Sequence, residues 1–123
     1  MAFENPVLTI SLPASADLSA EQLKFVVNNG SGAAAVAGAA ASALGVIQNN
    51  PTAAGTASIM VLGVSRVRAG AAIAVGAKLG SDANGKAVTA TTGDTILGIA
   101  LEAAAADEDI IPVLLHAGTA LLV

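Results

Sequence analysis

Few side chains in this sequence of 123 residues could take part in catalysis. The chain has one histidine, His116, and no cysteine, so a nucleophile and its base could meet only around that imidazole. No serine lies in the Gly-x-Ser-x-Gly turn of the α/β-hydrolases. His116 follows Leu114 and Leu115 and precedes Ala117 and Gly118, a setting typical of a partly exposed residue at the end of a strand. We therefore predict no catalytic residue and no enzymatic activity.

Two acidic segments could in principle attract a cation. Asp107, Glu108 and Asp109 are adjacent, and three neighbouring carboxylates on a loop point in different directions. Residues 81–85 resemble the start of a calcium-binding loop, but the downstream bidentate glutamate that such a loop needs is missing. We interpret the first segment as a solvated turn and the second as a hairpin turn. The glycine-rich stretch 30–45 lacks the patterns that bind phosphates or dinucleotides, so we expect no metal and no cofactor.

The composition argues against nucleic acid and membrane partners. A net charge of -4 disfavours binding to duplex phosphates. The only aromatic residues are Phe3 and Phe25, too few to stack the bases of a single strand. The mean hydropathy is +0.75, but the uncharged stretch 25–65 is interrupted by asparagines, glycines and a proline and cannot be a spanning helix. Without cysteine, the chain is compatible with a reducing compartment such as a cytoplasm.

The first 16 residues differ from the rest and are predicted to form an extended N-terminal arm. Proline stands near both ends of this segment, which disfavours a helix and suits an edge strand. Between the prolines, Leu8, Ile10 and Leu12 alternate with polar residues, which indicates a strand with one apolar face. Such an arm could add a strand to the sheet edge of a neighbour.

From residue 23 onward, turn dipeptides separate short runs rich in valine and isoleucine, the pattern of an all-β domain. Two segments could instead form single helical turns. They are 17–24, where Ser19 and Gln22 have the spacing of a capping box, and 102–106, which is rich in alanine. The expected strands are 23–28, 34–37, 43–48, 57–68, 71–79, 86–90, 95–101, 109–115 and 119–123.

An internal near-repeat organises these strands. Residues 44–47, Leu-Gly-Val-Ile, recur about 53 positions later as Leu-Gly-Ile-Ala at 97–100, and an apolar strand follows each copy. We predict that residues 17–123 form a single β-domain, a small antiparallel barrel or sandwich built from two similar halves at about 23–68 and 71–123. The glycine in each copy would let two strands approach closely or form a bulge.

The surface of this domain is expected to be partly buried in an assembly. Only 11% of the residues are charged, and a monomer with so few charges would tend to associate. Arg66 and Arg68 are two positions apart, so they share one face of a strand. This pair could contact an acidic partner surface.

Four segments together resemble the decoration proteins of tailed-phage capsids, also called cement or head-fibre proteins. The segments are LGVIQNNP at 44–51, VLGVSRVRAG at 61–70, SDANGKAV at 81–88 and GDTILGIALE at 93–102. The resemblance extends from about residue 18 to residue 115 and leaves the arm outside. It implies a structural virion protein that is made in the host cytoplasm, binds the outer surface of a bacteriophage capsid and stabilises the shell. It implies no catalytic residues and no cofactor.

The partners that the resemblance implies are the major capsid protein and further copies of the same chain, as a trimer in preference to a dimer. Leu8, Ile10 and Leu12 of the arm, with Arg66 and Arg68, are the residues that we expect to contact the capsid or another subunit. The alternative function is a surface-binding module, displayed on the head, that recognises glycans or the cell envelope. Because sugar sites usually use aromatic platforms, the absence of tyrosine and tryptophan disfavours this alternative.

Overall fold

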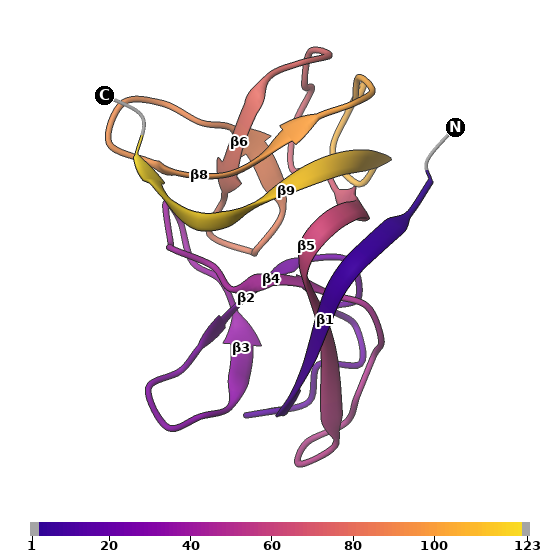
Figure 1. Ribbon diagram of the computed structural model, residues 1–123, viewed down its shortest axis with the longest axis vertical. Coiled ribbons are helices and arrows are strands. Elements are labelled where there is room, and N and C mark those ends of the chain that lie inside the picture. The colour runs from indigo at the N-terminus through magenta and orange to yellow at the C-terminus, as the bar shows by residue number, and fades with distance from the viewer. Residues whose placement is uncertain (1–2, 122–123) are drawn as a thin grey trace.

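Nine strands of the described chain join in one antiparallel sheet that curls on itself into a half-barrel (Figure 1). The computed structural model describes residues 3–121, and the side chains of residues 3–115. No helix long and apolar enough to span a membrane occurs in this part of the chain. The strands are β1 (Asn5–Pro13), β2 (Phe25–Asn28), β3 (Ala34–Val36), β4 (Gly45–Ile47), β5 (Thr56–Arg68), β6 (Lys78–Ser81), β7 (Ala87–Thr89), β8 (Thr95–Ala100) and β9 (Ile110–Leu121). The predicted all-β class is confirmed.

The two halves of the sheet repeat the same connections and the same register. The order is β3-β2-β4-β5-β9-β8-β6-β7, so each half has a hairpin, then a strand beside the hairpin, then a long strand. Val26 pairs with Val36 in β2–β3, and Leu79 pairs with Thr89 in β6–β7. The residues of the second pair lie about 53 positions after those of the first. Val26 also pairs with Gly45, as Leu79 does with Gly98. The domain is therefore built from two similar halves, as the repeat predicts.

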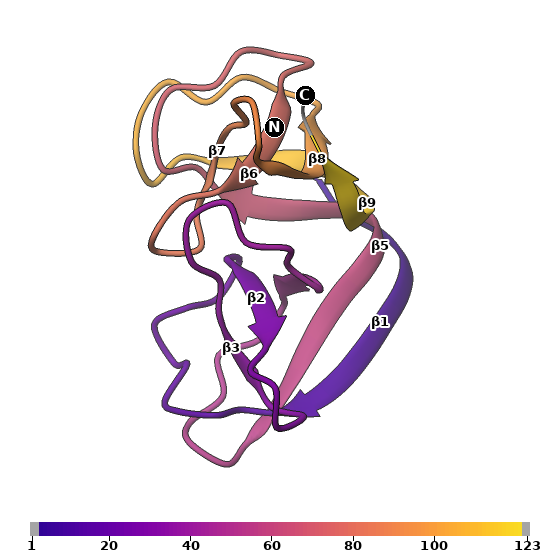
Figure 2. The same cartoon turned by 90° about the vertical axis from the view of Figure 1, so that its left-hand side faces the viewer.

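Strand β5 belongs to both halves. Its N-terminal part pairs with β4, and its C-terminal part pairs with β9. We call β1–β4 with residues 56–61 the first half, and residues 62–68 with β6–β9 the second half. Figure 2 shows β5 running from the lower half into the upper half, where it bends toward β9. The halves are thus joined within a strand rather than by a loop.

The N-terminal arm is a strand of this same sheet. β1 runs antiparallel along β5, from Pro13 opposite Thr56 to Asn5 opposite Val64 (Figure 1). The sequence allowed an edge strand or an addition to a neighbour's sheet, and the structure pairs the arm with β5 of its own chain. The physical reason is that the N-terminal part of β5 would otherwise present a bare edge beside apolar side chains.

β1 is also the counterpart of the C-terminal part of β5. Ala14, directly after β1, forms a parallel bridge with Ala34, and Ala69, directly after β5, forms one with Ala87. The amide of Ala14 donates to the Gly55 carbonyl at 2.8 Å, and the amide of Ala69 donates to the equivalent carbonyl, that of Asp109, at 2.7 Å. The arm therefore completes the first half in the same way that β5 completes the second.

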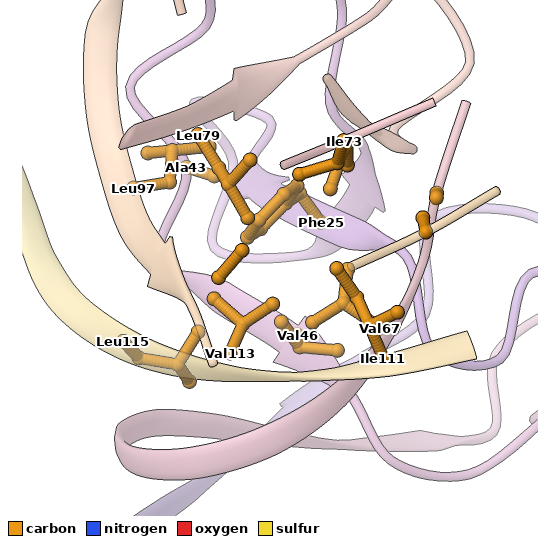
Figure 3. Packing of buried hydrophobic residues seen from close by; sticks show 14 of the residues in the cluster. Phe25, Ala43, Val46, Val67, Ile73, Leu79, Leu97, Ile111, Val113 and Leu115 are labelled. Carbon is orange, nitrogen blue, oxygen red and sulfur yellow. The ribbon is translucent and has the colours of Figure 1, made fainter. Parts of the chain in front are cut away.

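Two clusters of buried aliphatic side chains form the core, one for each half. Val26, Ile47 and Ile59 belong to the cluster of the first half, and Leu79 and Val113 to the larger cluster of the second. Five buried side chains of the first half belong to the larger cluster instead: two alanines, Ala37 and Ala43, and the three larger residues Phe25, Val46 and Met60. Figure 3 shows Phe25 and Val46 among the side chains of the second half. Because burial of one such side chain stabilises a fold by roughly 1.5–3 kcal/mol, these three residues hold the halves together.

Glycines allow the close strand approach that the near-repeat predicts. A Cβ at Gly45 would lie 2.1 Å from the Met60 carbonyl oxygen, and a Cβ at Gly98 would lie 2.6 Å from that of Leu114. No side chain fits at these distances, so both positions require glycine. The expectation of a close crossing at the two Leu-Gly positions is confirmed.

Four local expectations differ from the structure. The segment 71–79 is not one strand, because Gly76 has a φ of +82° and β6 begins only at Lys78. The segment 17–24 forms turns in place of a helical turn, and in 102–106 Ala104 forms a bridge with Ile73. The strands expected at 109–115 and 119–123 form one strand, β9, and residues 122–123 lie outside the described part.

The turn expected at residues 81–85 does join a hairpin, β6–β7. One Asp82 carboxylate oxygen accepts the amides of Asn84 and Lys86 at 2.8 and 2.9 Å. Gly85 has a φ of +78°, which glycine adopts without strain. Asp82 therefore holds the turn through its carboxylate.

Candidate interaction surface

The three predicted apolar residues of β1 do not share one environment. Ile10 and Leu12 are half-buried and pack against the core of the first half. Leu8 is 49% exposed and lies opposite Leu62, which is 42% exposed. The structure therefore separates an exposed Leu8 from two residues that pack against the protein's own core.

A double irregularity in the β1–β5 ladder accounts for this separation. Pro6 pairs with Gly63, Leu8 with Leu62 and Thr9 with Met60, so Val7 has no partner on β5. Gly63 has a φ of +120°, and a Cβ there would lie 2.5 Å from the Asn5 carbonyl oxygen. Val7 is 72% exposed as a result. We call Val7, Leu8 and Leu62 the bulge patch. Its position depends on Gly63, which belongs to β5 and not to β1.

Arg66 and Arg68 lie on the same strand but contact different groups. The Arg66 Nε atom is 3.5 Å from a Glu4 carboxylate oxygen. The Arg68 guanidinium contacts the Glu108 carboxylate at 3.1 Å and donates to the Gln22 carbonyl at 2.8 Å. Both side chains are partly exposed, and Arg66 is the more accessible of the two. The two predicted cations are therefore already paired within the chain.

The acidic loop after β8 is held by ion pairs. Lys86 Nζ lies 3.0 Å from Asp107 and 2.6 Å from Glu108, and Arg68 contacts the same Glu108 carboxylate. The hydrogen bond from Lys86 lowers the pKa of Glu108, and the hydrogen bonds to Glu108 and Asp107 raise the pKa of Lys86. Asp109 instead accepts the amide of Ala105 at 2.7 Å. These carboxylates fix the loop against the β6–β7 hairpin, and no cluster fit for a metal was found among the described residues.

The model of the phage cement protein family matches residues 3–115. This chain belongs to the phage cement proteins. The match includes the N-terminal strand, whereas the sequence resemblance placed the arm outside the shared pattern. No curated protein sequence matches the chain.

A solved structure supports the same fold. The phage cement protein is similar to the head fiber gp8.5 N base of bacteriophage phi29, with a TM-score of 0.72 and 18% sequence identity. The similarity covers 92% of this chain and 98% of that chain. Together, the family and the fold identify a structural protein of the phage head.

His116, the one candidate for catalysis, belongs to β9, but its side chain lies outside the described part of this cement protein. The residues that the structure describes form no pocket. The features available for binding are therefore surface features: the bulge patch, the partly exposed Arg66 and the outer edge of β1.

Proposed function

We propose that this phage cement protein binds the outer surface of an assembled capsid and joins neighbouring copies of the major capsid protein. The proposal is supported by the family match and by the similarity to a head fiber base. Each bound copy adds a modest contact, and many copies bound at once shift the shell toward its assembled state by mass action. No cofactor is needed for this role.

The observation that carries the proposal is the exposed apolar patch on an edge strand. Within the described chain, β1 pairs only with β5, so its other edge has no strand partner. The bulge patch puts Val7 and Leu8 on this edge strand, where Val7 is largely exposed and Leu8 about half exposed. A strand edge next to apolar side chains suits the addition of an extended segment of another protein, which supplies main-chain hydrogen bonds. We propose that a segment of the capsid protein binds here.

Arg66 lies near the same end of β1 and would add charge to the contact. Its partner Glu4 is itself partly exposed, at 3.5 Å. Exposed ion pairs of this kind are weak, so a capsid carboxylate could replace Glu4 at little cost. Arg68 is less available, because it is held by Glu108 and by the Gln22 carbonyl.

The test is a binding assay with purified, expanded capsids that lack the decoration protein. We expect the wild-type protein to bind them at micromolar concentration and to raise the temperature at which they break open. The double variant Val7→Ser, Leu8→Ser should bind at least tenfold more weakly. Val75→Ser is the matched control, because Val75 is 66% exposed but lies in the loop before β6.

Two outcomes would overturn the proposal. One is the absence of capsid binding by the wild-type protein, and the other is unchanged binding by the Val7, Leu8 double variant. Reproducible binding to a glycan array without capsid binding would favour the alternative of a surface-recognition module.

A further inference from the structure

The two halves of the chain contact each other through two different faces. On the first half, a row of cross-strand partners runs from Thr9 through Met60 and Val46 to Phe25. Directly opposed residues of an antiparallel sheet point to the same side. Met60, Val46 and Phe25 are almost fully buried, in the core cluster of the second half. We call this row the outer row of the first half.

The second half has an equivalent outer row that the described chain covers only in part. It runs from Val64 through Leu114 and Ile99 to Lys78, with the same pairing pattern. Leu114 is 42% exposed, Ile99 and Val64 are half-buried, and Lys78 is exposed. The row that is almost fully buried from Met60 to Phe25 in one half is thus partly open to solvent in the other.

The inner face on which such a row packs differs in the opposite sense: it is covered in the second half and partly exposed in the first. In the second half it includes Leu97 and Leu115, which are 2% and 4% exposed under the first half. Their counterparts in the first half, Leu44 and Val61, are only half-buried. The first half therefore has an incompletely covered inner face where the second half has a covered one.

Backbone contacts at the junction show the same asymmetry. The Phe25 amide donates to the Gly85 carbonyl at 2.7 Å, and a Cβ at Gly85 would meet Val36 at 2.8 Å. The counterpart Gly32 has the same left-handed backbone, with nothing within 4 Å of its Cβ position. The space beside Gly85 is thus filled by the first half, whereas the equivalent space beside Gly32 is open.

One polar contact links the halves across the junction, and the equivalent residues on the two exposed faces are apolar. The Gln48 side chain donates to the Ser65 hydroxyl at 3.0 Å and links the halves. The counterpart of Gln48 is Leu101, which is 36% exposed, and the counterpart of Ser65 is Ile10, which is half-buried. Solubility favours polar residues at exposed positions. Leu101 and Ile10 therefore indicate surfaces that another protein covers.

We propose that a second copy of this chain docks head to tail and repeats the contact between the halves. The outer row of the second half, with Ile99, Leu114 and Leu101, packs on the inner face of the first half of the next copy, at Ile10 and Leu44. Because the two faces differ, the contact is heterologous. Such a contact generates a closed ring or an open filament according to the rotation between copies, and the proposal is the closed ring. The contact uses neither the capsid nor the bulge patch, so it stands apart from the proposed function.

The test measures mass in solution without capsids. We expect the wild-type protein to form a ring of defined mass by light scattering or sedimentation. Leu114→Glu changes the outer row and Leu44→Glu the inner face. Each variant alone should be at least tenfold weaker in self-association. An equimolar mixture should form a dimer, because each variant retains the face that the other lacks.

The mixture distinguishes a heterologous contact from a symmetric one, in which two damaged faces would not restore binding. Val7→Glu, in the bulge patch that this contact does not use, is the control for an added surface charge and should leave the ring unchanged. If Leu44→Glu fails to fold by circular dichroism, Ile10→Glu replaces it as the inner-face variant. A monomeric wild-type protein at high micromolar concentration, an unchanged mass for Leu114→Glu, or a mixture that forms no complex would overturn the proposal.

Discussion

The amide of Phe25 donates a 2.7 Å hydrogen bond to the carbonyl of Gly85 and so ties β2 of the first half to the β6–β7 hairpin of the second. Gly85 can approach this closely because it has no side chain: a Cβ would lie 2.9 Å from the Phe25 carbonyl oxygen. The junction between the halves is thus set by a backbone contact as well as by buried side chains.

Replacement of Gly85 should therefore weaken the junction. Gly85→Ala strains a backbone with φ +78° and also creates a clash with Val36, so we expect a loss of roughly 3 kcal/mol in the free energy of unfolding. Gly32→Ala is the matched control, because it shares the positive φ but has open space and should lose only roughly 1–2 kcal/mol. Urea denaturation of both variants measures the difference. Equal losses would show that the approach of Phe25 is not tight.

Phe25 itself should be far more important for stability than its counterpart Lys78. Phe25 is 1% exposed in the larger core cluster, and removal of a buried aromatic ring leaves a cavity. We expect Phe25→Ala to lose about 3–5 kcal/mol of the free energy of unfolding. Lys78→Ala, at an exposed position, should change it by about 0.5 kcal/mol or less. Similar losses in thermal or urea denaturation would contradict this account of the junction.

The close approach at Gly45 predicts a large effect of a single methyl group. A Cβ there would lie 2.1 Å from the Met60 carbonyl oxygen, and the backbone of β5 must move to admit it. We expect Gly45→Ala to cost roughly 3 kcal/mol or to prevent folding. Gly38→Ala has open space and an ordinary φ, so it should be neutral or slightly stabilising. Expression yield and denaturation midpoints compare the two variants, and a well-folded Gly45→Ala protein of normal stability is the contrary result.

Ala40 and Gly93 occupy equivalent turns and offer a reciprocal exchange. Ala40 has a φ of +58° and Gly93 a φ of +92°, so only the second residue suits its backbone. Ala40→Gly should relieve strain and stabilise the protein by about 0.5–1 kcal/mol. Gly93→Ala should destabilise it by roughly 1–2 kcal/mol, although nothing lies within 4 Å of the new Cβ. Shifts of the same sign in the two melting temperatures would refute the explanation.

The ion pairs of Glu108 predict a pH-dependent contribution to stability. Its pKa is lowered by Lys86, so the contribution is present above the usual glutamate pKa of about 4.3 and is lost as the pH falls through the lower pKa of the folded state. At neutral pH, Glu108→Gln should lower the melting temperature by about 1–4 °C, since exposed ion pairs are weak. The difference from wild type should vanish in acid.

High salt should also reduce this difference, because it screens exposed charges. The contribution of Lys86, whose pKa is raised, should persist through neutral pH and disappear only as the pH rises past the pKa of the folded state. A melting-temperature difference for Glu108→Gln that is the same at every pH and salt concentration would contradict the assignment.

The sequence predicts the strands of the first half more closely than those of the second, where Gly76 interrupts the expected strand 71–79 and one strand, β9, replaces two expected strands. Left-handed positions fall on Gly76 and Gly93 in the second half, whereas the equivalent positions of the first half hold Leu23 and Ala40. A tertiary fold can impose a positive φ on an ordinary residue at a modest cost. Such positions give no local signal, so the duplication is visible in the strand register before it is visible in the residues.

The arm shows the same limit. Its alternation correctly predicts a strand, but its counterpart in β5 holds Ser65 and Val67 where β1 holds Ile10 and Leu12. With so little shared chemistry, nothing in the first 16 residues indicates that they complete the first half. The pairing follows from the edge of β5, which is distant in the sequence.

The positions of the predicted contact residues depend on strand pairing and ion pairing that the sequence does not show. Leu8, Ile10 and Leu12 have the spacing of one face, and the bulge opposite Gly63 turns Leu8 away from the other two. The ion pairs of Arg66 come from a residue 62 positions earlier in the chain, Glu4, which no local pattern could reveal. Whether these residues contact the capsid is for the binding assay to decide.

The continuity of β5 has a mechanical consequence. Because one strand of 13 residues closes the first half and opens the second, a force that separates the halves loads a covalent backbone along its length. The ladders that β5 forms with β1, β4 and β9 lie parallel to this load, so their hydrogen bonds must break together in shear and not one after another. The two halves are thus joined by a covalent strand as well as by buried side chains.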